Sequence, residues 1–367
     1  MKILVLNWKH LSDPAAGGAE YYVARVASAW SARGHRVTML VPRPGGRARP
    51  GTTDPEGVQI EELGSRTTVF RQARQYLRER GHEFDAVLES VSTRPFFAHE
   101  LVGDRALVLY HQIADDVWGN EFPFPVSWVG QRVVEPHWLR RIRGARVAAN
   151  SPSTAADLTA RGVVPVGIVP PGADPVGESA AAELGPHPRV IFVGRLVRTK
   201  RPLDAIQAFA RIRAAFPAAT LDIVGDGYLR AELERRRAPG VTVHGFVPAP
   251  IKAAFLARAN LLLLPGTREG WGIVAIEAGL HGLPVVAYDV PGLRDAVLDR
   301  TTGLLTECSP AALGEAAVAL MQDPDRWARY AQATQERSRL FTWQRAADDL
   351  FDLIPPALRT PSVADAA

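Results

Sequence analysis

Two glutamates, Glu269 and Glu277, lie in the segment REGWGIVAIEAGLHG with seven residues between them. From Ile273 onward the apolar residues follow a helical period, and Glu277 lies among them on the stripe that should face the core. A carboxylate in that position is costly unless it is paired or hydrogen-bonded. We therefore expect Glu277 to have a binding partner.

The distance between the two carboxylates bears on the chemistry they could do. If the segment were all helix, a rise of about 1.5 Å per residue would separate them by roughly 12 Å. Two carboxylates that cleave one glycosidic bond lie about 5 to 9.5 Å apart. The pair therefore fits an extended ligand such as a nucleotide sugar, whose ribose diol would give Glu277 two hydrogen-bond donors.

Gly270 and Gly272 precede the predicted helix, where unhindered backbone amides can point at a ligand and an anion is favoured. A glycine turn that only caps a helix is the common alternative, but it does not account for Glu277. Arg195 and Lys200, in VGRLVRTK, could neutralise a diphosphate. Taken alone, these two cations are better explained as exposed residues near a helix start.

Short apolar runs must position these loops. In the second half of the chain the runs alternate with helical stretches such as PLDAIQAFARIRAAF. This alternation predicts a doubly wound parallel sheet, which binds ligands at the carboxyl ends of its strands. The six predicted strands are RVIFVGRL, TLDIVGDG, VTVHGFV, NLLLLPG, LPVVAYDV and TGLLTE.

The first half of the chain shows the same alternation. Its predicted strands are KILVLN, HRVTMLVP, FDAVLES, RALVLYHQ and RVAANS. A first helix follows Gly17 and Gly18 and ends near Gly34, and its apolar stripe consists of Ala19, Tyr22, Val23, Val26, Ala27 and Trp30. The fold class is therefore α/β, with two facing Rossmann-like doubly wound domains.

A linker is predicted where proline, glycine and small residues accumulate without periodicity, in GIVPPGADPVGESAAAELGPHP. The expected boundaries are an N-terminal domain over residues 1–168, a linker region over 169–188 and a C-terminal domain over 189–343. A C-terminal helix over 344–358 is expected to cross back to the N-terminal domain. The end of the chain, PPALRTPSVADAA, has the composition of a frayed tail.

Composition sets limits on compartment and partner. At 367 residues the chain exceeds what one core usually organises, and its 43 Lys plus Arg against 39 Asp plus Glu are dispersed, unlike a nucleic-acid-binding block. Cys308 is the only cysteine, which fits a reducing compartment. The apolar run in MKILVLNWKH is too short for a signal peptide or a membrane span. We expect a cytoplasmic protein, and the alanine- and arginine-rich composition suggests a bacterial one.

Two familiar motifs do not apply to this chain. DPD, residues 323–325, has the spelling of a metal-binding D-x-D, but its proline and the helical run after it predict a helix start. No metal is expected. The loop after the first strand lacks G-x-G-x-x-G, and the second strand ends in LVPRP without an acidic residue for an NAD ribose, which argues against a dehydrogenase.

Three motifs, GRLVRTK, GDGYLR and EGWGIVAIEA, resemble in order and spacing those of family 4 retaining glycosyltransferases, which have the GT-B fold. The last is similar to the family's E-x7-E motif, and the resemblance extends over essentially the whole chain. Two residues depart from the pattern. Arg201 stands where many relatives have glycine, and Trp271 replaces the more usual phenylalanine.

The resemblance implies a donor site without cofactor or metal. Arg195 and Lys200 would bind the donor diphosphate, Glu269 the transferred sugar and Glu277 the ribose. The resemblance also implies that backbone amides of Gly270, Trp271 and Gly272 contact the sugar or phosphate. It implies that the backbone of Gly18 approaches the donor phosphate or acceptor, and that Phe246 and Val247 contact the base.

His111 ends the strand ALVLYH, where relatives place an active-site histidine that faces the sugar. A lone histidine at a strand end is otherwise more often a satisfied structural residue. With the resemblance, we expect His111 to position or polarise the sugar, so His111 and Glu269 are the expected catalytic residues.

Residues 115–146 are rich in aromatic residues and then in arginines. This segment could form an acceptor wall or a face that contacts the inner surface of the cell membrane. A core helix with a solvated basic edge explains it equally well.

The sequence thus predicts a hexosyltransferase that moves a sugar from a UDP- or GDP-linked donor, with retention of configuration, to an acceptor glycan, lipid or small molecule. A sugar-nucleotide epimerase or a glycosyl phosphorylase on the same fold is the first alternative. A catalytically silent binding or scaffold protein is the second, but the presence of both glutamates and both cations argues against it.

Overall fold

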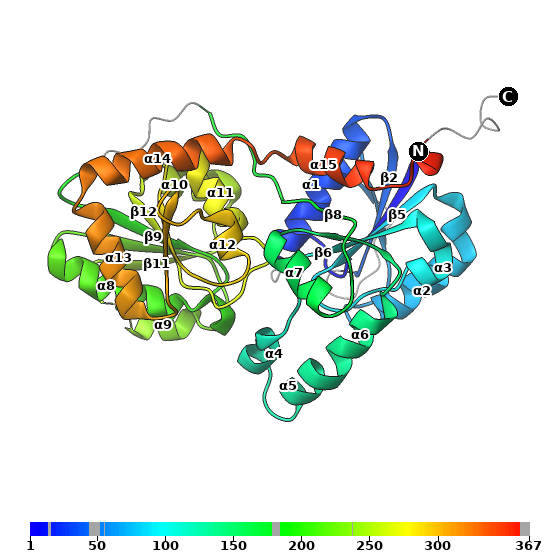
Figure 1. The fold of residues 1–367 in the computed structure, drawn as a ribbon, viewed down its shortest axis with the longest axis horizontal. Coiled ribbons are helices and arrows are strands. Elements are labelled where there is room, and N and C mark those ends of the chain that lie inside the picture. The colour runs from blue at the N-terminus through cyan, green and yellow to red at the C-terminus, as the bar shows by residue number, and fades with distance from the viewer. Residues whose placement is uncertain (14–15, 44–51, 55, 178–183, 237, 360–367) are drawn as a thin grey trace. The chain divides into compact units, whose positions relative to one another are not determined.

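The computed structural model describes residues 1–13, 16–43, 52–54, 56–177, 184–236 and 238–359 (Figure 1). Its contacts divide the chain into two compact units, one made of 1–119, 123–172 and 343–367 and the other of 120–122 and 173–342. Part of the expected linker, residues 178–183, lies outside the described residues, as does the end of the expected tail, 360–367.

The first unit contains an eight-stranded sheet in the order β3-β4-β2-β1-β5-β6-β7-β8. All pairs are parallel except β3 with β4. The strands are β1 (Lys2–Leu6), β2 (Arg36–Val41), β3 (Thr52–Thr53), β4 (Gln59–Glu62), β5 (Ala86–Val91), β6 (Ala106–Tyr110), β7 (Arg146–Ala149) and β8 (Gly167–Ile168). The five predicted strands are confirmed, whereas β3 and β8 were not predicted because each has only two residues, and β4 was not predicted because it is mostly polar.

Helices cover both faces of this sheet (Figure 1). The helices in this part of the structure, not all of which contact the sheet, are α1 (Gly18–Ala32), α2 (Val69–Arg80), α3 (His99–Val102), α4 (Asp116–Glu121), α5 (Val126–Val129), α6 (Glu135–Arg141), α7 (Pro152–Ala160), α15 (Trp343–Asp352) and α16 (Pro356–Arg359). The predicted apolar stripe of α1 is buried, and Trp30 Nε1 donates a 2.9 Å hydrogen bond to the carbonyl of Ala347 in α15. The expected frayed tail thus begins with a short helix, α16.

The second unit contains a six-stranded parallel sheet in the order β11-β10-β9-β12-β13-β14. Its strands are β9 (Arg189–Val193), β10 (Thr220–Val224), β11 (Val241–Gly245), β12 (Leu261–Leu264), β13 (Val285–Tyr288) and β14 (Gly303–Thr306). All six predicted strands are confirmed. Their hydrophobic runs are buried because helices flank both faces of a doubly wound sheet.

The helices of the second unit are α8 (Pro202–Ala215), α9 (Arg230–Arg236), α10 (Ala249–Arg258), α11 (Ile273–Leu280), α12 (Leu293–Ala296), α13 (Pro310–Met321) and α14 (Pro324–Ser338). Asp323 caps α14 by accepting a 2.9 Å hydrogen bond from the Arg326 amide, so the helix start predicted at DPD is confirmed. Among the helices that the structure describes, none combines the length and the hydropathy that a membrane span requires.

The Gly-Asp-Gly loop after β10 packs directly on the loop after β9. A Cβ on Gly225 would lie 1.9 Å from the carbonyl oxygen of Gly194, and one on Gly227 would lie 2.4 Å from that of Leu196. The two loops are also joined by a 2.8 Å hydrogen bond from the Leu196 amide to the Asp226 carbonyl. These glycines are therefore required for close backbone packing behind the loop that carries Arg195.

We expect Gly225→Ala to lower the free energy of unfolding by about 3 kcal/mol, since the backbone of a neighbouring strand end cannot give way to the methyl group. Gly177→Ala is the matched control because an added Cβ there meets no atom within 4 Å, and it should change stability by less than about 0.5 kcal/mol. Urea unfolding measures both. Equal stability of the two variants would contradict the close packing of these loops.

Candidate functional site

The strand order of the second unit reverses between β9 and β12. From β9 the chain proceeds through β10 to β11 on one side, and it returns to β12 and continues to β14 on the other. A doubly wound sheet binds ligands at the carboxyl ends of the strands that flank this reversal. The predicted residues Arg195 and Lys200 follow β9, and Glu269 follows β12.

Lys200 and Glu269 are brought together by these two loops. Lys200 Nζ donates a hydrogen bond to Glu269 Oε1, and the two side chains are only 21% and 18% exposed. A 2.9 Å hydrogen bond from the Thr267 amide to the Thr199 carbonyl joins the same loops through their backbones. Two predicted site residues that lie far apart in the sequence thus form one half-buried ion pair.

Arg195, in the same loop as Lys200, is exposed. Within the described residues its guanidinium makes no ion pair and no side-chain hydrogen bond, although the backbone around it is fixed by the Gly-Asp-Gly loop. The geometry therefore leaves one cation available to a ligand at the strand-order reversal.

The backbone at Glu269 is fixed by the loop after β13. The Glu269 amide donates a 3.2 Å hydrogen bond to the Pro291 carbonyl. A Cβ on Gly292 would lie 2.2 Å from the Glu269 carbonyl oxygen, so glycine is required for this approach. The position of Glu269 therefore depends on β12 and β13 together.

Glu277 has a partner within the unit that the sequence did not predict. Lys252 Nζ lies 2.7 Å from both oxygens of Glu277, whose side chain is 17% exposed. Lys252 belongs to α10 and Glu277 to α11, and the pairing depends on how these two helices pack. No sequence pattern connects the two residues, which is why the lysine was missed.

The helix after the glycine loop begins only at Ile273, so the all-helix spacing of roughly 12 Å does not apply to the two glutamates. Gly272 precedes it with φ +100°, a left-handed conformation that favours glycine. The indole of Trp271 is 4% exposed and its ring lies 5.3 Å from that of Phe341. At Gly270, Trp271 and Gly272, only backbone groups are therefore suited to meet a ligand.

Phe246 and Val247 follow β11 and differ in environment. Phe246 is 78% exposed, whereas Val247 packs against the core of the unit. An exposed aromatic ring at the carboxyl edge of the sheet can stack on a planar base.

Arg201 has a structural explanation. It directly precedes α8 with φ +48° and ψ +50°, the left-handed conformation in which glycine is favoured. Its Nε donates a 2.6 Å hydrogen bond to Asp204, which also accepts a 2.7 Å hydrogen bond from the Tyr288 hydroxyl. The ion pair offsets the backbone strain, so Arg201 belongs to the helix cap.

In the first unit, Gly17 precedes α1, and its amide donates a 2.7 Å hydrogen bond to Glu20 in the first turn. Gly18 begins the helix and is exposed. This loop follows β1 at the carboxyl edge of the sheet, so the backbone of Gly18 is accessible where a ligand would bind.

His111 directly follows β6 and is 4% exposed. Its Nε2 lies 3.1 Å from the Ser90 hydroxyl, and its ring packs edge-on against Tyr22 with the centroids 5.5 Å apart. Burial lowers the pKa of His111 to about 3, so the imidazole is neutral at physiological pH. The sequence did not indicate Ser90, because a serine at the end of an apolar strand carries no distinguishing pattern.

Comparison with known proteins places the chain in a family. A family model described as Glycosyltransferase Family 4 matches residues 16–176, and one described as Glycosyl transferases group 1 matches 187–323. The D-inositol 3-phosphate glycosyltransferase of Segniliparus rotundus is 30% identical over 402 aligned positions, which cover 97% of this chain and 88% of that protein. The chain belongs to glycosyltransferase family 4.

Solved structures agree with the GT-B fold of this transferase. Sucrose-phosphate synthase from Thermosynechococcus elongatus has a TM-score of 0.77 at 22% identity, with 96% of this chain and 98% of that one covered. Anabaena HepE, in complex with UDP and glucose, has a TM-score of 0.72 at 19% identity over the same shares. The predicted family and fold class are confirmed, and the epimerase or phosphorylase alternative is not favoured.

The low pKa of His111 predicts how the stability of the transferase depends on pH. Below about pH 6.5 the histidine of the unfolded chain takes up a proton that the folded protein excludes, so this residue lowers stability as the pH falls. When the pH falls from 7 to 5, we expect the free energy of unfolding of the wild type to decrease by about 2 kcal/mol more than that of His111→Gln.

Urea unfolding at the two pH values measures this difference. His137→Gln, at an exposed position of the same unit, should lose as much stability as wild type. If His111→Gln and wild type lost equal stability between pH 7 and pH 5, His111 would not be buried as a neutral base.

Proposed function

We propose that this family 4 transferase moves a hexosyl group from a UDP- or GDP-linked donor to an acceptor hydroxyl with retention of the anomeric configuration. The observation that carries the proposal is the Lys200–Glu269 ion pair at the strand-order reversal, with the exposed Arg195 in the same loop as Lys200. Cations for a diphosphate and a carboxylate for sugar hydroxyls meet there. The structure of Anabaena HepE in complex with UDP and glucose supports a donor of this class.

Departure of the diphosphate is the step that these residues would assist. As the bond from the anomeric carbon to the diphosphate oxygen breaks, Arg195 and Lys200 would stabilise the charge that develops on that oxygen. The acceptor hydroxyl would attack from the same face and pass its proton to the departing diphosphate. We propose that no metal takes part, since two side-chain cations and the amides at Gly270, Trp271 and Gly272 can supply the stabilisation.

Glu269 and His111 would act on the sugar. Glu269 would accept hydrogen bonds from sugar hydroxyls once the donor draws Lys200 toward the diphosphate. His111 has a neutral imidazole, so it would position the sugar through a hydrogen bond and would not act as a nucleophile.

The same proposal assigns the other end of the donor and the acceptor. Glu277 would bind the ribose diol, Phe246 and Val247 would contact the base, and Gly18 would approach the donor phosphate or acceptor. The acceptor would be a glycan, a lipid or a small molecule, and the name of the Segniliparus relative makes an inositol phosphate the first acceptor to test. We propose a cytoplasmic site of action.

Donor binding without metal is the first test. A nucleotide sugar at about one hundred times its Kd should raise stability by about 2.7 kcal/mol and the melting temperature by several degrees. Among UDP, GDP, ADP, TDP and their common sugar conjugates, we expect only the uracil or guanine nucleotides to raise the melting temperature. Glu277→Ala should abolish most of that increase.

The Lys252–Glu277 pair provides the control for this test. Lys252→Met breaks the same ion pair but keeps the carboxylate, so it should retain the donor-dependent shift. Loss of the shift in both variants would contradict the ribose role of Glu277, and an absent shift with every nucleotide would contradict the proposed donor class.

Transfer itself is the second test. His111→Ala and Glu269→Ala should each lower the rate of acceptor-dependent nucleoside diphosphate release by about a hundredfold or more, since each removes a group that contacts the reacting sugar. His137→Ala, at an exposed position, serves as the control and should transfer at the wild-type rate. Rates near wild type in both site variants would overturn the assignment, and diphosphate release without acceptor would indicate another reaction.

A further inference from the structure

One short segment, which lies in the first unit except for Phe122, exposes an unusual amount of hydrophobic surface. Six of the fifteen large hydrophobic residues that the structure shows as exposed lie within residues 122–133. They are Phe122 (46%), Phe124 (81%), Val126 (50%), Trp128 (55%), Val129 (41%) and Val133 (50%). Single exposed apolar residues are ordinary, but a cluster of this kind marks an interaction surface.

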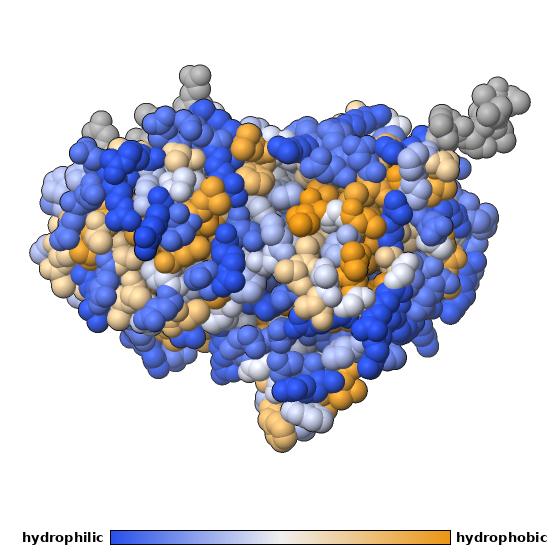
Figure 2. Space-filling model, in the orientation of Figure 1, coloured by the Kyte–Doolittle hydropathy of each residue, from blue (hydrophilic) through white to orange (hydrophobic). Residues whose placement is uncertain are grey.

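We call residues 122–133 the apolar tip. It includes α5, and a π-helical turn over Gly130–Val134 joins α5 to α6 in one continuous helical run. In Figure 1 this run extends away from the sheet of its own unit, and Figure 2 shows hydrophobic colour at its end. The sequence explanation of a core helix with a basic edge holds only for the second half of the segment.

The base of the helical run is firmly fixed to the unit. Leu139 and Ile142 are buried, and the carboxylate of Glu135 accepts hydrogen bonds of 2.6 and 2.9 Å from the amides of Ala114 and Asp115. Close packing also holds the middle, because a Cβ on Gly130 would lie 2.2 Å from the Trp118 ring.

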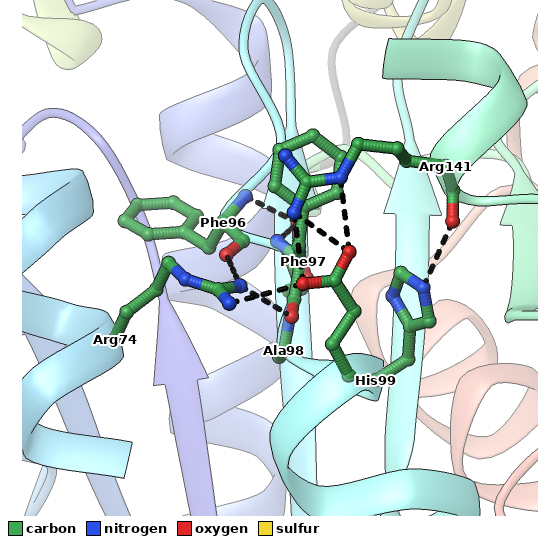
Figure 3. Close-up of polar contacts among 8 residues, drawn as sticks. Arg74, Phe96, Phe97, Ala98, His99 and Arg141 are labelled. Atoms are coloured by element: carbon green, nitrogen blue, oxygen red, sulfur yellow. Dashed lines mark hydrogen bonds and ion pairs between the residues drawn. The ribbon is translucent and has the colours of Figure 1, made fainter. Parts of the chain in front are cut away.

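Arg141 completes the attachment at the end of α6 (Figure 3). Its Nη2 lies 2.7 and 2.8 Å from the two oxygens of Glu100, a carboxylate that Arg74 also contacts at 3.0 Å. The Arg141 carbonyl accepts a 3.1 Å hydrogen bond from His99. The apolar tip is therefore presented on a rigid support, and its exposure is a property of the folded unit.

From the tip to the end of α6 the exposed charges are basic, whereas Asp116 and Glu121 lie just before the tip in the sequence. Residues 122–146 contain five arginines and a single acidic residue, Glu135, which is 5% exposed. Only Arg141 has a carboxylate partner among the residues that the structure describes, whereas Arg143 and Arg146 donate to backbone carbonyls. Arg132, one turn after Trp128, and Arg140 are exposed and have no carboxylate partner there.

We propose that the apolar tip docks on an anionic membrane surface. Phe124 and Trp128 enter the boundary between head groups and acyl chains, where aromatic side chains are favoured, while Arg132 and Arg140 contact lipid phosphates. A second copy of this chain fits less well, because a two-fold contact through the tip would place the same unpaired arginines opposite one another. The proposal goes beyond the transfer reaction and does not depend on the identity of the donor.

Vesicle binding of the full chain tests the proposal. Wild type should cosediment with vesicles of phosphatidylcholine containing one-third phosphatidylglycerol and much less with pure phosphatidylcholine. Phe124→Ser with Trp128→Ser should weaken binding by at least tenfold, and Arg132→Gln with Arg140→Gln by about fivefold for each arginine. Two exposed controls in the same unit, Val164→Ser and Arg71→Gln, should bind as wild type does.

A second measurement does not depend on the loss of binding in a variant. Cys308 is the only cysteine, so Val126→Cys in a Cys308→Ser background can carry one environment-sensitive nitrobenzoxadiazole dye. Its emission should shift to the blue when the anionic vesicles are added. The same dye on Val164→Cys should not shift.

Three results would overturn the proposal. One is equal binding to both kinds of vesicle by wild type and the serine variant, and another is an unchanged dye spectrum at position 126. The third is a concentration-dependent doubling of the mass in sedimentation velocity that the serine substitutions abolish, which would assign the tip to self-association. Because nucleotide-induced melting shifts should persist in all tip variants, failure here is distinguishable from failure of the proposed reaction.

Discussion

The attraction between Lys200 and Glu269 is the interaction on which the candidate site depends. Partly buried charges are costly unless they are paired. The ion pair therefore holds the loop after β9 against the loop after β12, at the point where the strand order reverses. The close backbone packing at Gly225 fixes the first of these loops, and Gly292 fixes the second. An incoming diphosphate would compete for Lys200 and leave the Glu269 carboxylate available to sugar hydroxyls.

Buried carboxylates also fix loops in the first unit. Glu89, fully buried in β5, accepts hydrogen bonds of 2.6, 3.1 and 2.8 Å from the amides of Phe96, Phe97 and Ala98. Burial raises its pKa, and the three amides oppose that rise. Glu135 holds the loop after His111 in the same way. The first loop follows β5, which contains Ser90, and the second loop follows His111 at the end of β6. In both loops, hydrogen bonds from backbone amides to a buried carboxylate take the place of regular secondary structure.

Much of the fold could be predicted because periodicity is a local property of the sequence. The strands β9 to β14 and the helix α1 follow directly from their apolar spacing. β4 was missed because its sequence, QIEE, has only one buried residue. The glycine loop and the helix after it were predicted correctly, because α11 begins at Ile273, where the apolar period begins.

The sequence by itself determined the strand and helix order, the motif spacing and, through these, the family, because each depends on residues close together in the chain. Tertiary structure decided which partner each charged group has: Lys252 for Glu277, Ser90 for His111 and Asp204 for the left-handed Arg201. It also decided that Phe124 and Trp128 are exposed, although the sequence of their segment is equally compatible with a core helix. Such pairings and exposures depend on how elements distant in sequence pack, and spacing along one segment contains no information about that packing.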